Sequence, residues 1–220
     1  NWGTIGSIVM SWVISPLSGG AVAAAFLYLI KRSITYRNEM TEAASRVVPW
    51  LIALMAWAFC TYMLLKGLGQ LVKVDFWVAV ISGAGFGGVA WALVRKPIAR
   101  TAMRQDNSKE GVNRLFIWPL VCSAALLSFA HGANDVANAV GPLAAIYEAV
   151  KAGEIATKAA TPLWVMVLGA LGLAAGLALY GARLIRTVGK EITELDNMRA
   201  YSIAMSATLT VIVASQMGMP

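Results

Sequence analysis

Charged residues are scarce in this chain of 220 residues, and their scarcity excludes a soluble globular domain. Asp, Glu, Lys and Arg make up only 13% of the sequence, hydrophobic residues make up 59%, and the mean hydropathy is +0.68. Soluble domains carry about twice that share of charge. A chain of this size cannot bury so much apolar surface in one core and cover it with so few charges. We therefore expect an all-α polytopic membrane protein.

Cysteine and histidine are also rare. The two cysteines, Cys60 and Cys122, each lie inside an apolar run. This arrangement provides neither a disulfide framework nor the spacing of a metal site, so we interpret both as small buried hydrophobic residues. The chain has one histidine, His131.

Long apolar runs are plentiful. Uncharged runs cover residues 5–30, 49–65, 76–94, 163–182 and 200–217. Each has close to the ~20 residues that cross the hydrocarbon core of a bilayer. Together with a longer apolar region described below, they predict about six membrane segments. Two glycine pairs spaced four apart, Gly83/Gly87 and Gly172/Gly176, would allow close packing between membrane helices.

Basic residues are concentrated in alternate loops. Of the 18 Lys and Arg residues, 14 lie in three loops (31–46, 95–114 and 183–199) and four lie in the other linkers. The positive-inside rule predicts that the three basic loops are cytoplasmic, in a multi-pass protein of the plasma membrane, here a bacterial inner membrane. Topology thus explains the net charge of +7, and we expect no nucleic-acid partner. The loop 95–114 is also a candidate for contact with anionic lipid headgroups.

The apolar region 115–150 is too long for one straight crossing. As a single helix it would measure about 54 Å, against roughly 30 Å of hydrocarbon. Two crossings would place the basic loop 183–199 on the outside, so we expect one crossing with a break or re-entrant excursion. The break is predicted at Gly132 and at Gly141-Pro142, since proline lacks an amide donor and disfavours helix in the preceding residue.

The sequence His131-Gly-Ala-Asn-Asp-Val-Ala-Asn-Ala-Val-Gly-Pro142 lies inside this region. It contains the histidine and an acid, Asp135, near the middle of an apolar span, and an ionisable residue at such a depth marks a functional site. If the segment is helical, His131, Asn134, Asp135 and Asn138 share one side.

These residue types suit two kinds of ligand. Carboxylate and amide oxygens suit a hard cation, with sodium as the metal ion considered for Asp135, or Asp135 can take a proton. Amide nitrogens and the free N–H groups of a half-helix suit an anion. A bare carboxylate repels an anion, so anion and cation would favour binding together, which is the physical requirement for symport. Asp135 could also accept a hydrogen bond from protonated phosphate, whereas sulfate has no proton to donate.

The motif resembles the signature of the PiT family of inorganic phosphate transporters, whose members carry Gly-(Ala/Gly)-Asn-Asp-Val-(Ala/Ser)-Asn-Ala-(Ile/Val)-Gly-Pro once in each half. Other segments are similar to landmarks of the same family, namely residues 1–2 with 11–16, residues 189–193, and residues 214–220. The resemblance thus extends along the whole chain.

The resemblance implies a symporter of inorganic phosphate coupled to sodium or protons, built from two inverted repeats with two re-entrant hairpins and no cofactor besides the coupling ion. It assigns substrate and cation binding to Asn134, Asp135 and Asn138, with His131 just before the motif. The chain would be an internal fragment of one transporter domain. Residues 1–94 would close the first half, residues 95–114 would form a basic cytoplasmic loop, and residues 115–220 would belong to the second repeat.

The chain also departs from the family pattern. It lacks the first-half copy of the motif and both Ser-Thr-Thr-His hairpin tips, and Ala204 stands where some members carry Glu or Gln. Expected partners are inorganic phosphate, membrane lipid, the remainder of the same polypeptide and a second copy in a homodimer.

Three alternatives remain open at the level of the sequence. The first is a permease for sulfate or another tetrahedral oxyanion on the same scaffold. The second is an intramembrane hydrolase that pairs His131 with Ser128, although that spacing supplies neither an orienting group nor an oxyanion hole. The third is a purely structural membrane subunit. The chemistry of the motif favours a transporter over an enzyme.

Overall fold

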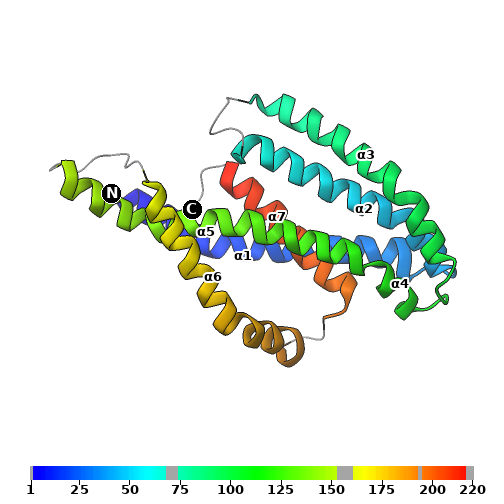
Figure 1. Cartoon of the computed structure of the whole chain (residues 1–220). Helices are drawn as coiled ribbons and strands as arrows, with labels where there is room; N and C mark the ends of the chain where they lie inside the picture. Colours follow the sequence, from blue (N-terminus) through cyan, green and yellow to red (C-terminus); the bar gives the residue numbers. More distant parts are fainter. Residues whose placement is uncertain (1, 68–73, 153–160, 193–194, 217–220) are drawn as a thin grey trace. The chain divides into compact units, whose positions relative to one another are not determined.

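Every regular element is a helix in the residues that the computed structural model describes, which are 2–67, 74–152, 161–192 and 195–216. In chain order (Figure 1) the elements are α1 (Trp2–Ile30), the π-helix η1 (Lys31–Thr35), α2 (Met40–Tyr62), the π-helix η2 (Met63–Gly67), α3 (Phe76–Ala102), α4 (Lys109–Leu115), α5 (Ile117–Ala152), α6 (Leu163–Arg186), the π-helix η4 (Thr187–Ile192) and α7 (Asn197–Gln216). The predicted all-α class is confirmed.

The chain divides into two compact units. Unit 1 comprises Asn1–Ser128 and Asp196–Pro220, and unit 2 comprises Phe129–Leu195. The boundary falls inside α5, so unit 2 contains the larger part of that helix together with α6 and η4. The predicted divisions at 94/95 and 114/115 concern the repeats of a longer transporter and stay a prediction.

Within the described residues, four helical spans are long and apolar enough to cross a membrane. They are Val9–Thr35, Met40–Leu65, Phe76–Ala102 and Leu163–Glu191, and a bent pair, Lys109–Leu115 with Ile117–Ala130, supplies a fifth. The run predicted at 200–217 forms most of α7, which is not among these spans, and the end of the run lies outside the described residues.

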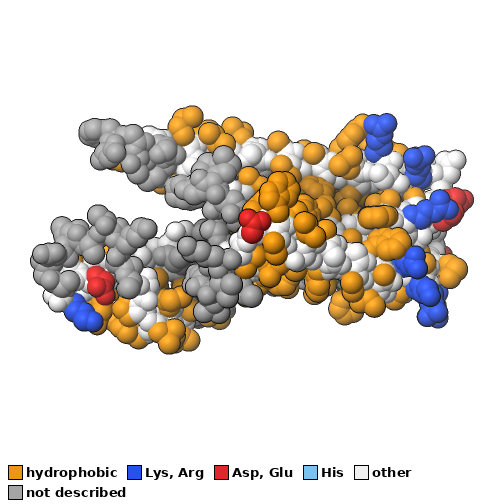
Figure 2. Space-filling view, turned by 90° about the horizontal axis from the view of Figure 1, so that it is seen from above, with side chains coloured by type: hydrophobic (Ala, Val, Ile, Leu, Met, Phe, Trp, Pro, Cys, Tyr) orange, Lys and Arg blue, Asp and Glu red, His pale blue; other side chains and the backbone are white. Residues whose placement is uncertain are grey.

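Large apolar side chains are exposed along these helices. Trp12 and Leu93 are each 70% exposed, and every residue from 171 to 180 on α6 is exposed. Figure 2 shows hydrophobic side chains spread over the helices and most of the visible Lys and Arg side chains at the right-hand end of the view. Water would penalise so much exposed apolar surface, whereas lipid would not. The exposure therefore agrees with the membrane setting inferred from composition.

The helices α2 and α3 pack closely along a glycine seam. A Cβ atom on Gly83 would lie 2.9 Å from the carbonyl oxygen of Trp57, and one on Gly87 would lie 2.7 Å from the carbonyl oxygen of Ala53. Neither position has room for a side chain, which confirms the close packing predicted for this pair. The pair Gly172/Gly176 differs, because a Cβ atom at either glycine would meet nothing within 4 Å.

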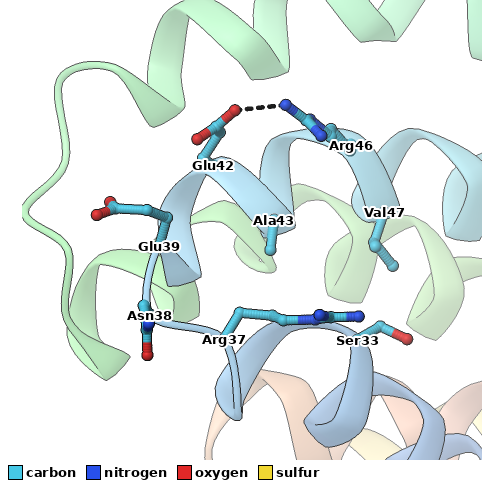
Figure 3. Close-up of a pocket in the computed structure, with 8 residues that line it drawn as sticks. All are labelled: Ser33, Arg37, Asn38, Glu39, Glu42, Ala43, Arg46 and Val47. Carbon is cyan, nitrogen blue, oxygen red and sulfur yellow. Dashed lines mark hydrogen bonds and ion pairs between the residues drawn. The ribbon is translucent and has the colours of Figure 1, made fainter.

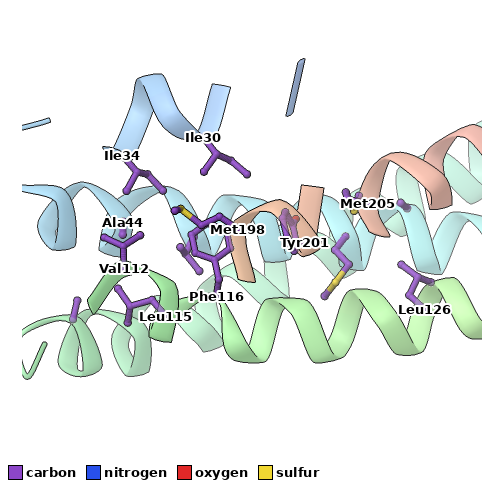
Figure 4. Packing of buried hydrophobic residues seen from close by; sticks show 14 residues of the cluster. Ile30, Ile34, Ala44, Val112, Leu115, Phe116, Leu126, Met198, Tyr201 and Met205 are labelled. Atoms are coloured by element: carbon purple, nitrogen blue, oxygen red, sulfur yellow. The ribbon is translucent and has the colours of Figure 1, made fainter. Parts of the chain in front are cut away.

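A buried apolar cluster holds one end of unit 1 together (Figure 4). Phe116, between α4 and α5, packs edge-on against Tyr201 of α7, with ring centroids 5.7 Å apart, and both are fully buried. The Tyr201 hydroxyl donates a hydrogen bond of 3.0 Å to the carbonyl oxygen of Leu51 on α2. Since this hydroxyl would be costly to bury alone, the bond fixes α7 against α2.

Within unit 1, hydrogen bonds join the first basic loop to the second, and the second to the last residues of the third. The side chain of Asn107, in the second loop, accepts from the backbone N–H of Met40 at 2.7 Å and donates to the carbonyl of Asn38 at 2.6 Å, both in the first loop. The side chain of Asn113 accepts from the backbone N–H of Met198, at the end of the third loop, at 3.3 Å. Loops that are distant in sequence thus lie together.

The predicted helix break is wrong, because α5 is continuous from Ile117 to Ala152 and passes through Gly132 and Gly141-Pro142. A bend of 45° lies instead at Phe116, between α4 and α5. Pro142 removes one hydrogen-bond donor, whereas unwinding the helix would leave several backbone groups unsatisfied in an apolar environment. The helix therefore continues through its proline, as α1, α2 and α3 do through Pro16, Pro49 and Pro97.

The prediction of buried cysteines is also wrong in part. Both thiols are free, but Cys60 is only half-buried and Cys122 is exposed. A thiol behaves as a small hydrophobic side chain, so in a membrane protein it does not have to be buried.

Candidate functional site

The motif positions form a stripe along α5 in unit 2. Because the backbone is helical throughout the motif, successive residues are rotated by about 100°. Positions 131, 134, 135 and 138 then fall within an arc of roughly 100°. We call these four positions the polar stripe.

The structure describes only part of the polar stripe at the level of side chains. Asn138 is exposed, while the side chains of His131, Asn134 and Asp135 lie outside the described residues. The binding roles predicted for these four residues therefore stay predictions, and the helix geometry fixes only their relative positions.

The helix α6 packs on the opposite side of α5. Val140 fills the space left by Gly169, where a Cβ atom would overlap Val140 Cγ1. Further along, Tyr147 of α5 meets Trp164 of α6 edge-on, with ring centroids 5.6 Å apart. Positions 140 and 147 are rotated by roughly 160–180° from the middle of the polar stripe. The contact with α6 thus uses the apolar back of α5.

A continuous helix changes how an anion could be held. The sequence prediction relied on free N–H groups at a helix break, but N–H groups inside an uninterrupted helix are already bonded to carbonyls four residues earlier. An anion at the polar stripe would then depend on side-chain donors, which here are the amides of Asn134 and Asn138 and the imidazole of His131.

Pro142 frees a different backbone group, which the sequence prediction missed. Having no N–H, Pro142 cannot donate to the carbonyl oxygen of Asn138, four residues earlier on α5. This carbonyl belongs to a residue of the polar stripe, and carbonyl oxygens are ligands for hard cations. The sequence does show that Pro142 follows Asn138 by four residues. This spacing predicts a free carbonyl at Asn138 only if the helix continues through Pro142.

The position at which the family resemblance implies an acid or amide in some members is apolar here. Ala204 lies buried on α7 in unit 1. Nearby buried hydroxyls bond to their own helix: Ser202 donates to the carbonyl of Met198 and Thr208 to the carbonyl of Ala204, each at 2.8 Å. Their protons are thus engaged, and Ala204 offers no side-chain ligand.

Apart from the polar stripe of unit 2, the chain has a polar hollow in unit 1, between η1 and α2 at the first basic loop (Figure 3). It is lined by Ser33, Arg37, Asn38, Glu39, Glu42, Ala43, Arg46 and Val47, with Glu42 and Arg46 forming an exposed ion pair. Two carboxylates balance the two guanidinium groups, so the hollow has no excess positive charge for an anion. No group of three His, Cys, Asp or Glu side chains that could hold a metal ion occurs among the described residues.

Comparison with known proteins decides the family. The phosphate transporter family matches residues 1–220. The chain belongs to this family. The family consists of transporters, and the resemblance to inorganic phosphate transporters that the sequence showed is confirmed.

The names of similar curated proteins agree with the family match. A Helicobacter pylori (strain J99) protein named "Putative phosphate permease" is 49% identical over 223 residues, which cover 100% of this chain and 42% of the relative. A Pyrococcus abyssi protein, "Putative phosphate permease PYRAB14010", is 35% identical, with 100% of this chain and 54% of the relative covered. The chain therefore spans about half the length of the curated relatives it matches.

One solved structure is similar to this chain over the whole length of the chain. The protein described as "The sodium-dependent phosphate transporter" matches with a TM-score of 0.87 and 29% sequence identity, covering 100% of this chain and 54% of that one. The similarity confirms the transporter fold.

Proposed function

We propose that this chain is part of a symporter that carries inorganic phosphate together with a cation, and that Asn134, Asp135 and Asn138 line its midplane binding site. Membership of the phosphate transporter family supports phosphate as the substrate. The name of the similar structure, a sodium-dependent phosphate transporter, supports sodium over a proton as the coupling ion. The observation that carries the site is the position of the polar stripe, on the face of α5 opposite its contact with α6.

Charge balance at the polar stripe would link the two ligands. The amides of Asn134 and Asn138 donate to phosphate oxygens, with His131 as a further donor. The Asp135 carboxylate and the Asn138 carbonyl freed by Pro142 coordinate the cation. Because the carboxylate repels an anion until its charge is neutralised, phosphate binds more tightly once the cation is present. Coupled binding of this kind is reciprocal.

The remainder of the same polypeptide would supply the other side of the site. Relatives are about twice as long as this chain, and alternating access in such transporters requires two repeats around one central site. We place the protein in the plasma membrane, in a bacterial inner membrane, with loops 31–46, 95–114 and 183–199 in the cytoplasm. We also propose that the protein forms a homodimer.

The test is uptake of radiolabelled phosphate by the full-length protein in liposomes, with an inward gradient of sodium or of protons. We expect sodium-driven uptake, and we expect Asp135→Asn to lower it about tenfold or more, which corresponds to about 1.4 kcal/mol. Glu148→Gln also replaces a carboxylate by an amide on α5, at a half-buried position after the motif. It should leave uptake unchanged.

Normal sodium-driven uptake by Asp135→Asn would refute the role given to this carboxylate. Uptake driven by the proton gradient alone would show that the coupling ion is a proton and not sodium. Sulfate, added as a competitor in the same assay, decides the alternative substrate: we expect little inhibition, and equal competition would assign the protein to a broader class of oxyanion permeases.

A further inference from the structure

An apolar groove runs along the α2–α3 pair in unit 1, away from the polar stripe. Trp50 and Trp57 of α2 and Trp91 of α3 form its walls, and it encloses about 330 Å³. The indole N–H of Trp57 donates to the carbonyl oxygen of Val80 at 3.1 Å, which fixes that ring. Gly88 also lines the groove, and a Cβ atom there would meet nothing within 4 Å. The missing side chain at Gly88 keeps the groove open.

A positive charge lies at one end of this groove. The rings of Trp50 and Trp91 stand 5.2 Å apart, and the guanidinium carbon of Arg95 lies 4.8 Å from the centroid of the Trp91 ring. Within the part of the chain that the structure describes, no carboxylate forms an ion pair with Arg95. A guanidinium stacked on an aromatic face keeps its N–H edge available for an oxyanion.

The groove lies where a lipid molecule would meet it. Both helices are long and apolar enough to span a membrane, and Trp50 is 64% exposed. Tryptophan pairs of this kind settle at the boundary between hydrocarbon and headgroups, and Arg95 follows the apolar run 76–94 directly. Trp50 and Trp57 are separated by about 10 Å along the helix axis, so the apolar part of the groove extends from the headgroup level into the hydrocarbon.

We propose that this groove is a specific site for a phospholipid with an anionic headgroup. One acyl chain lies between the three tryptophans, and a phosphate oxygen of the headgroup binds the guanidinium of Arg95. Charge selects this occupant over a second copy of the chain. A twofold contact centred on the groove would bring two copies of Arg95 towards each other, whereas a lipid phosphate neutralises the charge.

Native mass spectrometry of the full-length protein in detergent tests the proposal, because one spectrum reports both bound lipids and oligomeric state. The probes are phosphatidylglycerol and phosphatidylcholine. We expect wild-type protein to bind phosphatidylglycerol more tightly, because the choline cation of phosphatidylcholine offsets the charge of its phosphate. We expect Arg95→Gln to weaken phosphatidylglycerol binding roughly fivefold and phosphatidylcholine binding by less, so that the preference for phosphatidylglycerol falls. Arg100→Gln, the same change on the same helix but away from the groove, is the matched control and should bind as wild type.

Filling the groove gives an independent arm. Gly88→Leu should abolish the tightly bound lipid, whereas Gly85→Leu should not, since a Cβ atom at Gly85 also meets nothing within 4 Å and this residue does not line the groove. Wild-type binding of phosphatidylglycerol by both Arg95→Gln and Gly88→Leu would overturn the proposal. Conversion of a dimer to a monomer by Gly88→Leu, with lipid binding unchanged, would also overturn it and identify the groove as a subunit contact.

Discussion

At the residue scale, glycine matters in this protein where another backbone occupies the space of its missing side chain. Gly87 faces the carbonyl oxygen of Ala53, 2.7 Å from where a Cβ atom would stand, whereas Gly85, two residues earlier, faces open space. We therefore expect Gly87→Ala to push α2 and α3 apart and to destabilise the protein by about 1–3 kcal/mol. Thermal unfolding of the detergent-solubilised protein measures the effect.

Gly85→Ala is the control for this substitution. It makes the same gain in helix propensity, up to about 1 kcal/mol, without a steric cost, so its unfolding temperature should equal or exceed that of the wild type. Equal unfolding temperatures for the two variants would show that the seam between α2 and α3 is looser than the structure has it.

At the scale of the elements, sequence reasoning located membrane helices by their apolar length but did not foresee that α5 continues through its proline. Apolar length located the helices α3 and α6, whose runs at 76–94 and 163–182 lie inside Phe76–Ala102 and Leu163–Arg186. The break predicted at Gly141-Pro142 was wrong, because proline rules derived in water overlook the cost of unwinding in an apolar environment. Spacing on a continuous helix puts the positions of the polar stripe on one face, but it could not show that α6 packs against the opposite face.

A test of the continuous α5 follows from its proline. If the helix runs through Pro142, Pro142→Ala restores a donor for the Asn138 carbonyl and should raise the free energy of unfolding by up to about 3 kcal/mol. The same substitution should weaken sodium-driven uptake, since the carbonyl proposed as a cation ligand is then engaged. Thermal unfolding and the sodium dependence of uptake measure the two effects.

Pro16→Ala in α1 provides the comparison, because Pro16 also lies inside a helix but belongs to unit 1. It should stabilise the protein without changing the sodium dependence. A loss of stability in Pro142→Ala would indicate instead that the segment around the motif is unwound in the working protein.

At the scale of the whole molecule, the distribution of charge and the long-range contacts agree on one topology. Sequence counting placed 14 of 18 basic residues in three loops. In unit 1, Asn107 joins the second loop to the first, and Asn113 joins the second loop to Met198 at the end of the third. Sequence could not identify these two asparagines, since their partners lie more than 60 residues away. Because these loops lie together, one labelled residue in a basic loop reports on which side of the membrane the loops lie.

Labelling of single cysteines in intact cells measures that orientation. After Cys60 and Cys122 are replaced by alanine, Ser108→Cys in the second basic loop should resist a membrane-impermeant maleimide until the cells are opened, because the positive-inside rule places this loop in the cytoplasm. Thr161→Cys, in the weakly charged linker before α6, is exposed and should react from outside. Labelling of Ser108→Cys in intact cells, with Thr161→Cys protected, would invert the topology. The Asn107 and Asn113 contacts would then tie the loops together on the outer face, and the charge asymmetry would need a cause other than membrane orientation.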